Sequence, residues 1–166
     1  GEGLSAKHLL KNSKKLIILK AFTKLYGMAG VRLGYCLCSD TELLARMRAA
    51  GQPWAISGLA QAAGIAALDE TEYVAKVRAL IEAQRPVLAD GLRALGLRVI
   101  EGRANYLLFR APEALGEALR RKGAVLRSCG NYPGLDASWY RTAVRTENEN
   151  RQLLALLAET LPEVAQ

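Results

Sequence analysis

Three side chains that could bind or react with a small molecule lie close together in residues 21–35, "AFTKLYGMAGVRLGY". Lys24 supplies an amine, which becomes a nucleophile once it loses its proton, and neighbouring cations favour that loss. Arg32 supplies a permanent charge on a planar fork suited to a phosphate, and Thr23 supplies a hydroxyl for the same anion. Glycines lie between them, where backbone without a side chain can come close to a ligand. The spacing therefore predicts a reactive amine beside an anion-binding loop.

Two predicted strands bracket this loop. The apolar run over residues 15–22 is typical of a strand in a parallel sheet covered on both faces, and residues 31–39 form a second run. A helix is predicted over residues 40–50, because Ser39 begins a capping box and Gly51 follows the last helical residue. The loop should therefore be held between two strands and followed by a helix.

Two further helices are predicted downstream. Residues 56–70 are rich in Ala and Gly, with Ser57 as the cap, so we expect a buried helix whose neighbours approach closely. Residues 71–95 carry apolar side chains at helical spacing, with Pro86 expected to kink the helix and Gly96 to end it. A helix of this length often joins two domains.

The pattern then changes to short strands alternating with helices. Strands are predicted over residues 97–100, 105–110, 124–128 and 139–144, and helices over residues 112–122 and 146–160. A capping box from Thr146 to Glu149 opens the last helix. We therefore predict an α/β protein with domains over residues 1–80 and 81–166, joined by the helix at about 71–95.

Composition narrows the class of protein. Hydrophobic residues make up 51% of 166 residues and charged residues 23%, which favours a folded core over disorder. No apolar run approaches the ~18 residues that cross a bilayer, and the opening lacks the apolar core of a secretory signal, so we expect a cytoplasmic protein without a membrane partner. The three cysteines, Cys36, Cys38 and Cys129, are an odd number, and the lone "CLC" pair with one histidine cannot complete a tetrahedral zinc site. We expect reduced, buried cysteines and no metal.

The net charge of +7 is concentrated at the start of the chain. Residues 1–35 hold seven Lys or Arg and one acidic residue, whereas residues 36–166 hold sixteen and fifteen. A basic arm could bind phosphodiesters, so a non-enzymatic nucleic-acid-binding module is one alternative. The basic segment lacks interleaved aromatic residues and a nucleic-acid motif, so we expect no nucleic-acid partner.

The stretch "AFTKLYGMAGVRLGY" resembles the lysine motif of fold-type I, class I/II aminotransferase-like pyridoxal phosphate (PLP) enzymes, in the branch that contains histidinol-phosphate aminotransferase. Three later stretches, "GRANYLLFR", "VLRSCGNYPGLD" and "WYRTAVRTENEN", resemble most closely the C-terminal half of threonine-phosphate decarboxylases in order and spacing. The four stretches cover nearly the whole chain. The resemblance implies the C-terminal part of a large PLP-binding domain over residues 1–80, followed by a small α/β (α+β) C-terminal domain.

The resemblance also implies the site residues. Lys24 would carry pyridoxal 5'-phosphate, and Thr23 and Arg32 would hold its phosphate. Arg127 and Arg141 match the family's substrate-binding arginines, near the ends of adjacent predicted strands. A bidentate grip on a carboxylate sets its rotation about the Cα bond and so selects the bond that breaks.

The activity that the resemblance implies is PLP-dependent decarboxylation of L-threonine O-3-phosphate to aminopropanol phosphate in cobalamin biosynthesis. Histidinol-phosphate or a related class I/II amino transfer is the alternative, and the "NYPGLD" and "GRANY" stretches favour the first. Relatives act as homodimers, so a homodimer is expected of the full-length protein. The roles of Tyr26, Asn105, Tyr132 and Arg145 stay open.

Motifs that the family carries in its N-terminal half are missing from these 166 residues. They include a glycine-rich phosphate loop and an aspartate that pairs with the pyridinium nitrogen. Because the chain also begins with Gly1 instead of methionine, we expect a C-terminal piece of a longer enzyme. Without the aspartate the cofactor loses its electron sink, so we expect the piece alone to be inactive.

Overall fold

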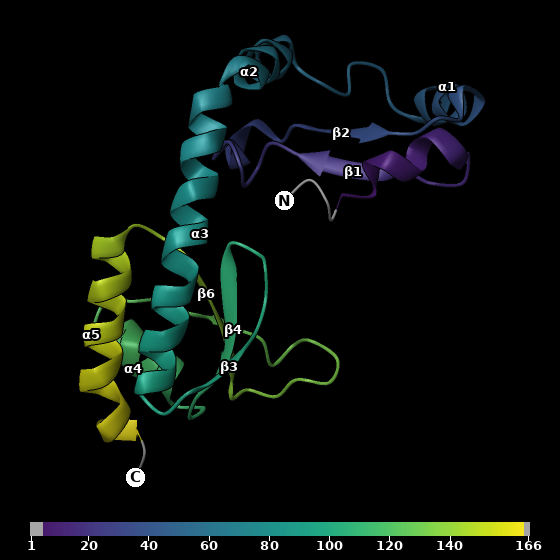
Figure 1. Cartoon of the computed structure of the whole chain (residues 1–166). Coiled ribbons are helices and arrows are strands. Elements are labelled where there is room, and N and C mark those ends of the chain that lie inside the picture. Colours follow the sequence, from purple (N-terminus) through teal and green to yellow (C-terminus); the bar gives the residue numbers. More distant parts are fainter. Residues whose placement is uncertain (1–4, 165–166) are drawn as a thin grey trace. The chain divides into compact units, whose positions relative to one another are not determined.

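The structure, a computed structural model, describes residues 5–164 (Figure 1). It contains two compact units, Gly1–Ala75 and Lys76–Gln166, called unit 1 and unit 2 below. The division falls inside the helix α3 (Thr71–Ala94), five residues before the boundary expected from the sequence. The chain mixes helices and strands, as the sequence predicts for an α/β protein.

Unit 1 is built around a two-stranded sheet. Its elements, besides the start of α3, are the 3-10 helices η2 (Ala6–Asn12) and η3 (Ala29–Val31), the strands β1 (Ile18–Ala21) and β2 (Gly34–Leu37), and the helices α1 (Thr41–Ala50) and α2 (Gly58–Asp69). Both predicted strands are therefore confirmed, on either side of the lysine loop.

The prediction that residues 15–22 form a strand of a parallel sheet covered on both faces is wrong for β1. β1 pairs antiparallel with β2, and three of its four residues are exposed, Leu19 by 78%. An apolar run indicates that a strand can be buried, but it says nothing about the direction of its partner.

The helix α1 begins one residue later than the capping box predicts. Asp40 is the cap, because its Oδ1 accepts a hydrogen bond from the Leu43 amide at 2.9 Å. Ser39, the predicted cap, instead donates from Oγ to the Ser13 carbonyl at 2.9 Å. Ser and Asp are both strong caps, so adjacent candidates leave the boundary uncertain by one residue. The helix ends before Gly51 as predicted, although Gly51 has an extended backbone.

The helix α2 begins as predicted, with Ser57 Oγ accepting from the Ala60 amide at 3.2 Å. The predicted close approach is confirmed at Gly64, where an added Cβ would collide with the side chain of Leu33. The prediction of a buried helix is wrong for its large side chains: Leu59 is 86% exposed and Ile65 is 68% exposed. Composition predicts close packing along one side of a helix but cannot show that the opposite side is covered.

Unit 2 is an antiparallel sheet with the order β3-β4-β6-β5, packed against helices. Its strands are β3 (Arg98–Ile100), β4 (Tyr106–Arg110), β5 (Arg127–Ser128) and β6 (Trp139–Ala143), and its helices are the remainder of α3, α4 (Leu115–Arg121) and α5 (Glu147–Val164). All six predicted elements are present, although β5 is shorter than the stretch 124–128. Gly96 follows α3 with φ +78, and the Leu97 amide donates to the Leu92 carbonyl at 3.2 Å, so the predicted helix end is confirmed.

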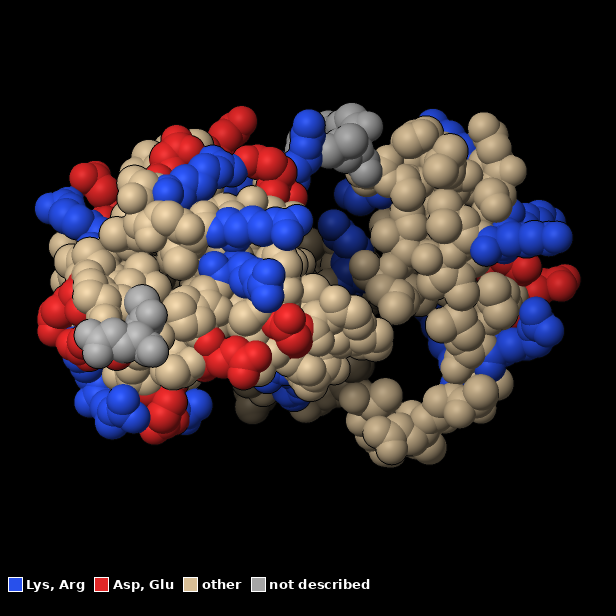
Figure 2. Space-filling view, turned by 90° about the horizontal axis from the view of Figure 1, so that it is seen from below, with Lys and Arg blue, Asp and Glu red and all other residues tan. Residues whose placement is uncertain are grey.

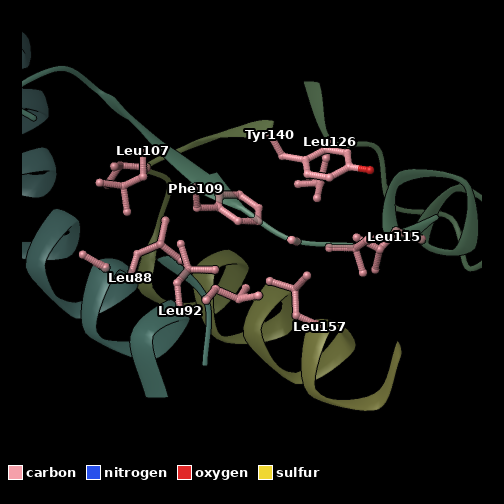
Figure 3. Close-up of a cluster of buried hydrophobic side chains, with 13 residues drawn as sticks. Leu88, Leu92, Leu107, Phe109, Leu115, Leu126, Tyr140 and Leu157 are labelled. Carbon is pink, nitrogen blue, oxygen red and sulfur yellow. The ribbon is translucent and has the colours of Figure 1, made fainter. Parts of the chain in front are cut away.

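The core of unit 2 lies between the sheet and its helices (Figure 3). Phe109 of β4 is fully buried against Leu88 and Leu92 of α3 and Leu157 of α5. The capping box of α5 is confirmed, because the Thr146 amide donates to Glu149 Oε2 at 3.2 Å and the Glu149 amide donates to Thr146 Oγ1 at 3.5 Å. This core fixes the strands whose other face carries the predicted substrate arginines.

Candidate functional site

The connection between β1 and β2 brings Thr23 and Arg32 together at its base. The Phe22 amide donates to the Leu33 carbonyl at 3.2 Å, which extends the β1–β2 pairing by one residue on each strand. Thr23 follows Phe22 and Arg32 precedes Leu33, so both lie where the connection opens. The two predicted phosphate ligands are therefore neighbours in space, although several residues separate them in sequence.

Lys24 lies in a tight turn within this connection. The Gly27 amide donates to the Lys24 carbonyl at 3.2 Å, and Gly27 has φ +65, a conformation that favours glycine. The Lys24 side chain is exposed, and within residues 5–164 it forms no ion pair. Its amine is therefore accessible to a small molecule. Tyr26, whose role the sequence leaves open, packs its ring 5.1 Å from that of Phe22.

Arg32 has a backbone conformation that arginine rarely adopts. Its φ is +56 and its ψ is +39, in the left-handed region, and its Nη1 donates to the Ala29 carbonyl at 3.3 Å. Such a conformation costs a non-glycine residue on the order of 1–3 kcal/mol, and these residues gather at ligand sites. The sequence gives no signal for this strain. A glycine would relieve it, so the presence of arginine points to a use for its charge.

The second predicted pair, Arg127 and Arg141, lies on one face of the unit 2 sheet. They are direct partners across β5 and β6, so their side chains point to the same side, away from the buried Phe109 and Tyr140. Like charges placed opposite each other destabilise a sheet. No carboxylate of residues 5–164 forms an ion pair with either arginine. The pair is thus an uncompensated double cation suited to an anion.

Two tyrosines surround the Arg141 guanidinium. Its central carbon lies 4.0 Å from the centre of the Tyr106 ring, and its Nη1 donates to the Tyr132 hydroxyl at 3.3 Å. Its Nε is buried and finds no hydrogen-bond partner among the described residues. Tyr132 was a candidate with an open role, whereas sequence reasoning missed Tyr106. The signal for Tyr106 is the strand register, which places it two residues from Leu108, the direct partner of Arg141.

The loop that carries Tyr132 is held by a polar network. Ser138 donates from its amide to Asp136 Oδ1 at 2.9 Å and also from its hydroxyl, while Arg110 Nε donates to Ser138 Oγ at 2.9 Å. The hydrogen bonds from Ser138, followed by the charge of Arg110, lower the pKa of the Asp136 carboxyl below its usual value. The network thus ties the loop to β4.

An open pocket of about 600 Å³ lies beside Arg127. It is also lined by Arg120, Val125, Leu126, Ser128, Gly130 and Asn131. Arg127 therefore lines this pocket and also belongs to the sheet face that it shares with Arg141.

The remaining open candidates have structural partners. Arg145 forms an ion pair with Glu149 at 2.7 Å. Hydrogen bonds from Thr146 and then from Arg145 lower the pKa of the Glu149 carboxyl. The Asn105 carbonyl accepts from the Val144 amide at 2.9 Å. Arg145 is therefore engaged at the start of α5.

The expectation of buried cysteines needs correction, and the two tryptophans differ in exposure. Of the three free cysteines, only Cys129 is buried, and Cys36 and Cys38 are half-buried. Trp54 lies in the turn between α1 and α2, where it is 97% exposed and has φ +59. Trp139 is half-buried, with the Arg98 guanidinium 5.6 Å from its ring centre.

On the face drawn in Figure 2, basic side chains lie in several separate groups and not in one continuous patch. Between residues 5 and 164, no helix has both the length and the apolar character to cross a bilayer.

The amino-acid sequence matches the family model "Aminotransferase class I and II" over residues 2–157. The chain is 37% identical over 160 residues to the threonine-phosphate decarboxylase of Salmonella typhimurium, covering 94% of this chain and 44% of that protein. It is 38% identical over 158 residues to the histidinol-phosphate aminotransferase of Symbiobacterium thermophilum, covering 93% and 43%. The chain thus spans less than half the length of these relatives.

Solved structures agree with the sequence matches. The histidinol-phosphate aminotransferase of Clostridium acetobutylicum superimposes with a TM-score of 0.93 at 31% identity, covering 98% of this chain and 51% of that one. The histidinol-phosphate aminotransferase of Sinorhizobium meliloti, solved in complex with pyridoxal-5'-phosphate, superimposes with a TM-score of 0.72 at 25% identity, covering 91% and 41%. The resemblance seen in the lysine motif and the three later stretches is confirmed at the level of the family: the chain belongs to the aminotransferase class I and II family.

Proposed function

We propose that the full-length protein containing this chain is a PLP-dependent enzyme that decarboxylates L-threonine O-3-phosphate to aminopropanol phosphate in cobalamin biosynthesis. The observation that carries the proposal is the uncompensated pair Arg127 and Arg141, which suits a substrate with strong anionic groups. The similarity of the "NYPGLD" and "GRANY" stretches to threonine-phosphate decarboxylases supports decarboxylation over amino transfer.

The β1–β2 connection fits pyridoxal 5'-phosphate by its donor set. Lys24 would hold the aldehyde, and the Thr23 hydroxyl and the Arg32 guanidinium, from residues at the base of the connection, would hold the phosphate. When bound, the cofactor supplies an aldehyde that reacts with amines and a conjugated ring that withdraws electrons. The strained Arg32 backbone supports this assignment, because glycine would relieve the strain and the position holds a permanently charged residue instead.

Arg127 and Arg141 would bind and orient the substrate's anionic groups. Two guanidinium groups on one sheet face provide several N–H donors, and a bidentate contact fixes rotation about the bond to the bound group. Fixing that rotation decides which substrate bond is held in position to break. The arginines would thereby contribute to selectivity as well as to affinity.

Histidinol-phosphate amino transfer is the second candidate. It is supported by a curated relative at 38% identity, against 37% for the decarboxylase, and by the structure with a TM-score of 0.93. Its substrate also carries a phosphate, so the arginine pair serves either reaction. A homodimer, on the basis of the family resemblance, and a cytoplasmic location, as expected from the sequence, complete the proposal.

The test uses the full-length protein with pyridoxal 5'-phosphate and O-phospho-L-threonine, and measures release of CO2. We expect release by the wild type, none above background for Lys24→Ala, and normal release for the control Lys15→Ala, an exposed lysine outside the connection. Consumption of histidinol phosphate that depends on 2-oxoglutarate, without CO2 release, would replace the first proposal with the second. Full activity of Lys24→Ala in either assay would refute the role of Lys24.

The proposal also states that the 166 residues alone are inactive. Turnover of O-phospho-L-threonine by the isolated chain at the rate of the full-length protein would contradict this part of the proposal.

A further inference from the structure

We infer that Tyr106 is a positioning residue for Arg141: its ring fixes the guanidinium, removes water from one of its faces and leaves the terminal nitrogens for an anionic ligand. The functional part of this inference rests on the proposed role of Arg141 in substrate binding. The geometric part stands on the contacts of Arg141 alone.

The first support is the contact between charge and ring. The guanidinium carbon lies 4.0 Å from the Tyr106 ring centre, well within the ~6 Å at which a cation is attracted to an aromatic face. Arginine loses considerable side-chain freedom when it is held in one orientation. The ring therefore holds the Arg141 side chain in one orientation before a ligand binds, so that the ligand has less side-chain freedom to remove.

The second support is the distribution of the Arg141 donors. Nε is buried without a partner among the described residues, and Nη1 already donates to the Tyr132 hydroxyl at 3.3 Å. An incoming anion can therefore reach Nη2 and the second hydrogen of Nη1, but not Nε. This arrangement favours an end-on contact with the two terminal nitrogens.

The third support is the charge balance around the ring. Arg127 is the direct cross-strand partner of Arg141, and within residues 5–164 neither has an acidic partner. Without a support, Arg141 would turn away from a like charge. The Tyr106 ring, with the negative face that aromatic rings present, holds the guanidinium beside Arg127 instead.

The kinetic test compares three single variants, Tyr106→Leu, Tyr106→Phe and Arg141→Gln, with a double variant that combines Tyr106→Leu and Arg141→Gln, all in the full-length protein with its cofactor. We expect Tyr106→Leu to raise KM for O-phospho-L-threonine about three- to tenfold with kcat changed less than about twofold. Tyr106→Phe keeps the ring and should behave as the wild type. In the Arg141→Gln background, Tyr106→Leu should have no further effect on KM.

A second measurement does not depend on substrate. Phenylglyoxal modifies accessible guanidinium groups, and peptide mapping reports the rate at each arginine. Tyr106→Leu should raise the rate at Arg141 about threefold or more, while the rate at Arg127 stays constant and Tyr106→Phe leaves both unchanged. Thermal unfolding of each variant checks that it is folded.

The outcomes separate the two proposals. An unchanged KM for Arg141→Gln would refute the substrate role of Arg141, and the modification rate would then decide the geometric inference alone. A raised KM for Arg141→Gln, with KM and modification rate unchanged in Tyr106→Leu, would overturn the inference on Tyr106 and leave the proposed function intact. A Tyr106→Leu effect that persists fully in the Arg141→Gln background would also overturn it.

Discussion

Removing one hydroxyl, by Tyr140→Phe, should destabilise unit 2 because that hydroxyl takes the place of a helix cap. The helix α4 starts after Ala114 without a capping side chain. The Tyr140 hydroxyl instead accepts from the Gly116 amide at 3.2 Å and donates to the Glu113 carbonyl at 2.6 Å. Tyr140 reaches the helix from β6, so a strand supplies the cap.

The expected cost follows from the groups left behind. Tyr140 is only 3% exposed, so phenylalanine fills the same space as its ring and removes no packing. What remains is an amide donor and a carbonyl acceptor without their partner, and an unpaired buried polar group costs about 1–3 kcal/mol. For a unit of this size, a loss of about 1 kcal/mol corresponds to a fall in Tm of roughly 4–8 °C.

The assay measures unfolding in urea by circular dichroism for the wild type, Tyr140→Phe and the control Tyr106→Phe. Tyr106 lies on the exposed face of the same sheet, so losing its hydroxyl should change the free energy of unfolding by less than about 0.5 kcal/mol. Hydrogen exchange at the Gly116 amide should become faster only in Tyr140→Phe. Equal stability of the two variants, with unchanged exchange at Gly116, would refute the cap.

Two other predictions concern the core and the loop network. Leu92→Ala, at a fully buried position of α3, should lower the free energy of unfolding, measured in urea, by about 2–5 kcal/mol. The control Val87→Ala, at a position of the same helix that is 53% exposed, should lower it far less. Similar losses in the two variants would contradict the assigned core. Because the folded-state pKa of Asp136 is lowered, chiefly by Ser138, its charge stabilises the fold above the unfolded-state pKa and this stabilisation is lost as pH falls through the folded-state pKa. The Tm difference between wild type and Asp136→Asn should therefore favour the wild type at about pH 7 and shrink in acid, and a difference independent of pH would count against the network.

Most elements of the fold could be predicted because their signals are local. The capping residues Ser57 and Thr146 and the glycine after α3 act within a few residues of the helix ends that they define. Strand direction and burial are not local, which is why the pairing of β1 and the exposure of Leu59 differ from the prediction. Strand direction and burial depend on which elements, distant in sequence, pack against each other in the folded chain.

The candidate site could be predicted by residue but not by geometry. Lys24 and Arg32 are visible in the motif, but the left-handed backbone of Arg32 depends on how the β1–β2 connection closes between Phe22 and Leu33. Tyr106 was missed because its contact with Arg141 crosses from β4 to β6, and strand register is needed to see it. The functional roles of these residues stay predictions until the proposed variants are measured.

The edges of the unit 2 sheet have a consequence for self-association. Both edge strands are short, three residues in β3 and two in β5, and each carries an arginine, Arg98 and Arg127. Short, charged edges give a second molecule little backbone on which to add a strand. We therefore expect Arg127 to limit strand addition at this edge, besides its proposed role in anion binding. Replacing it with glutamine instead of leucine keeps the edge polar, so that a loss of binding is not confused with aggregation.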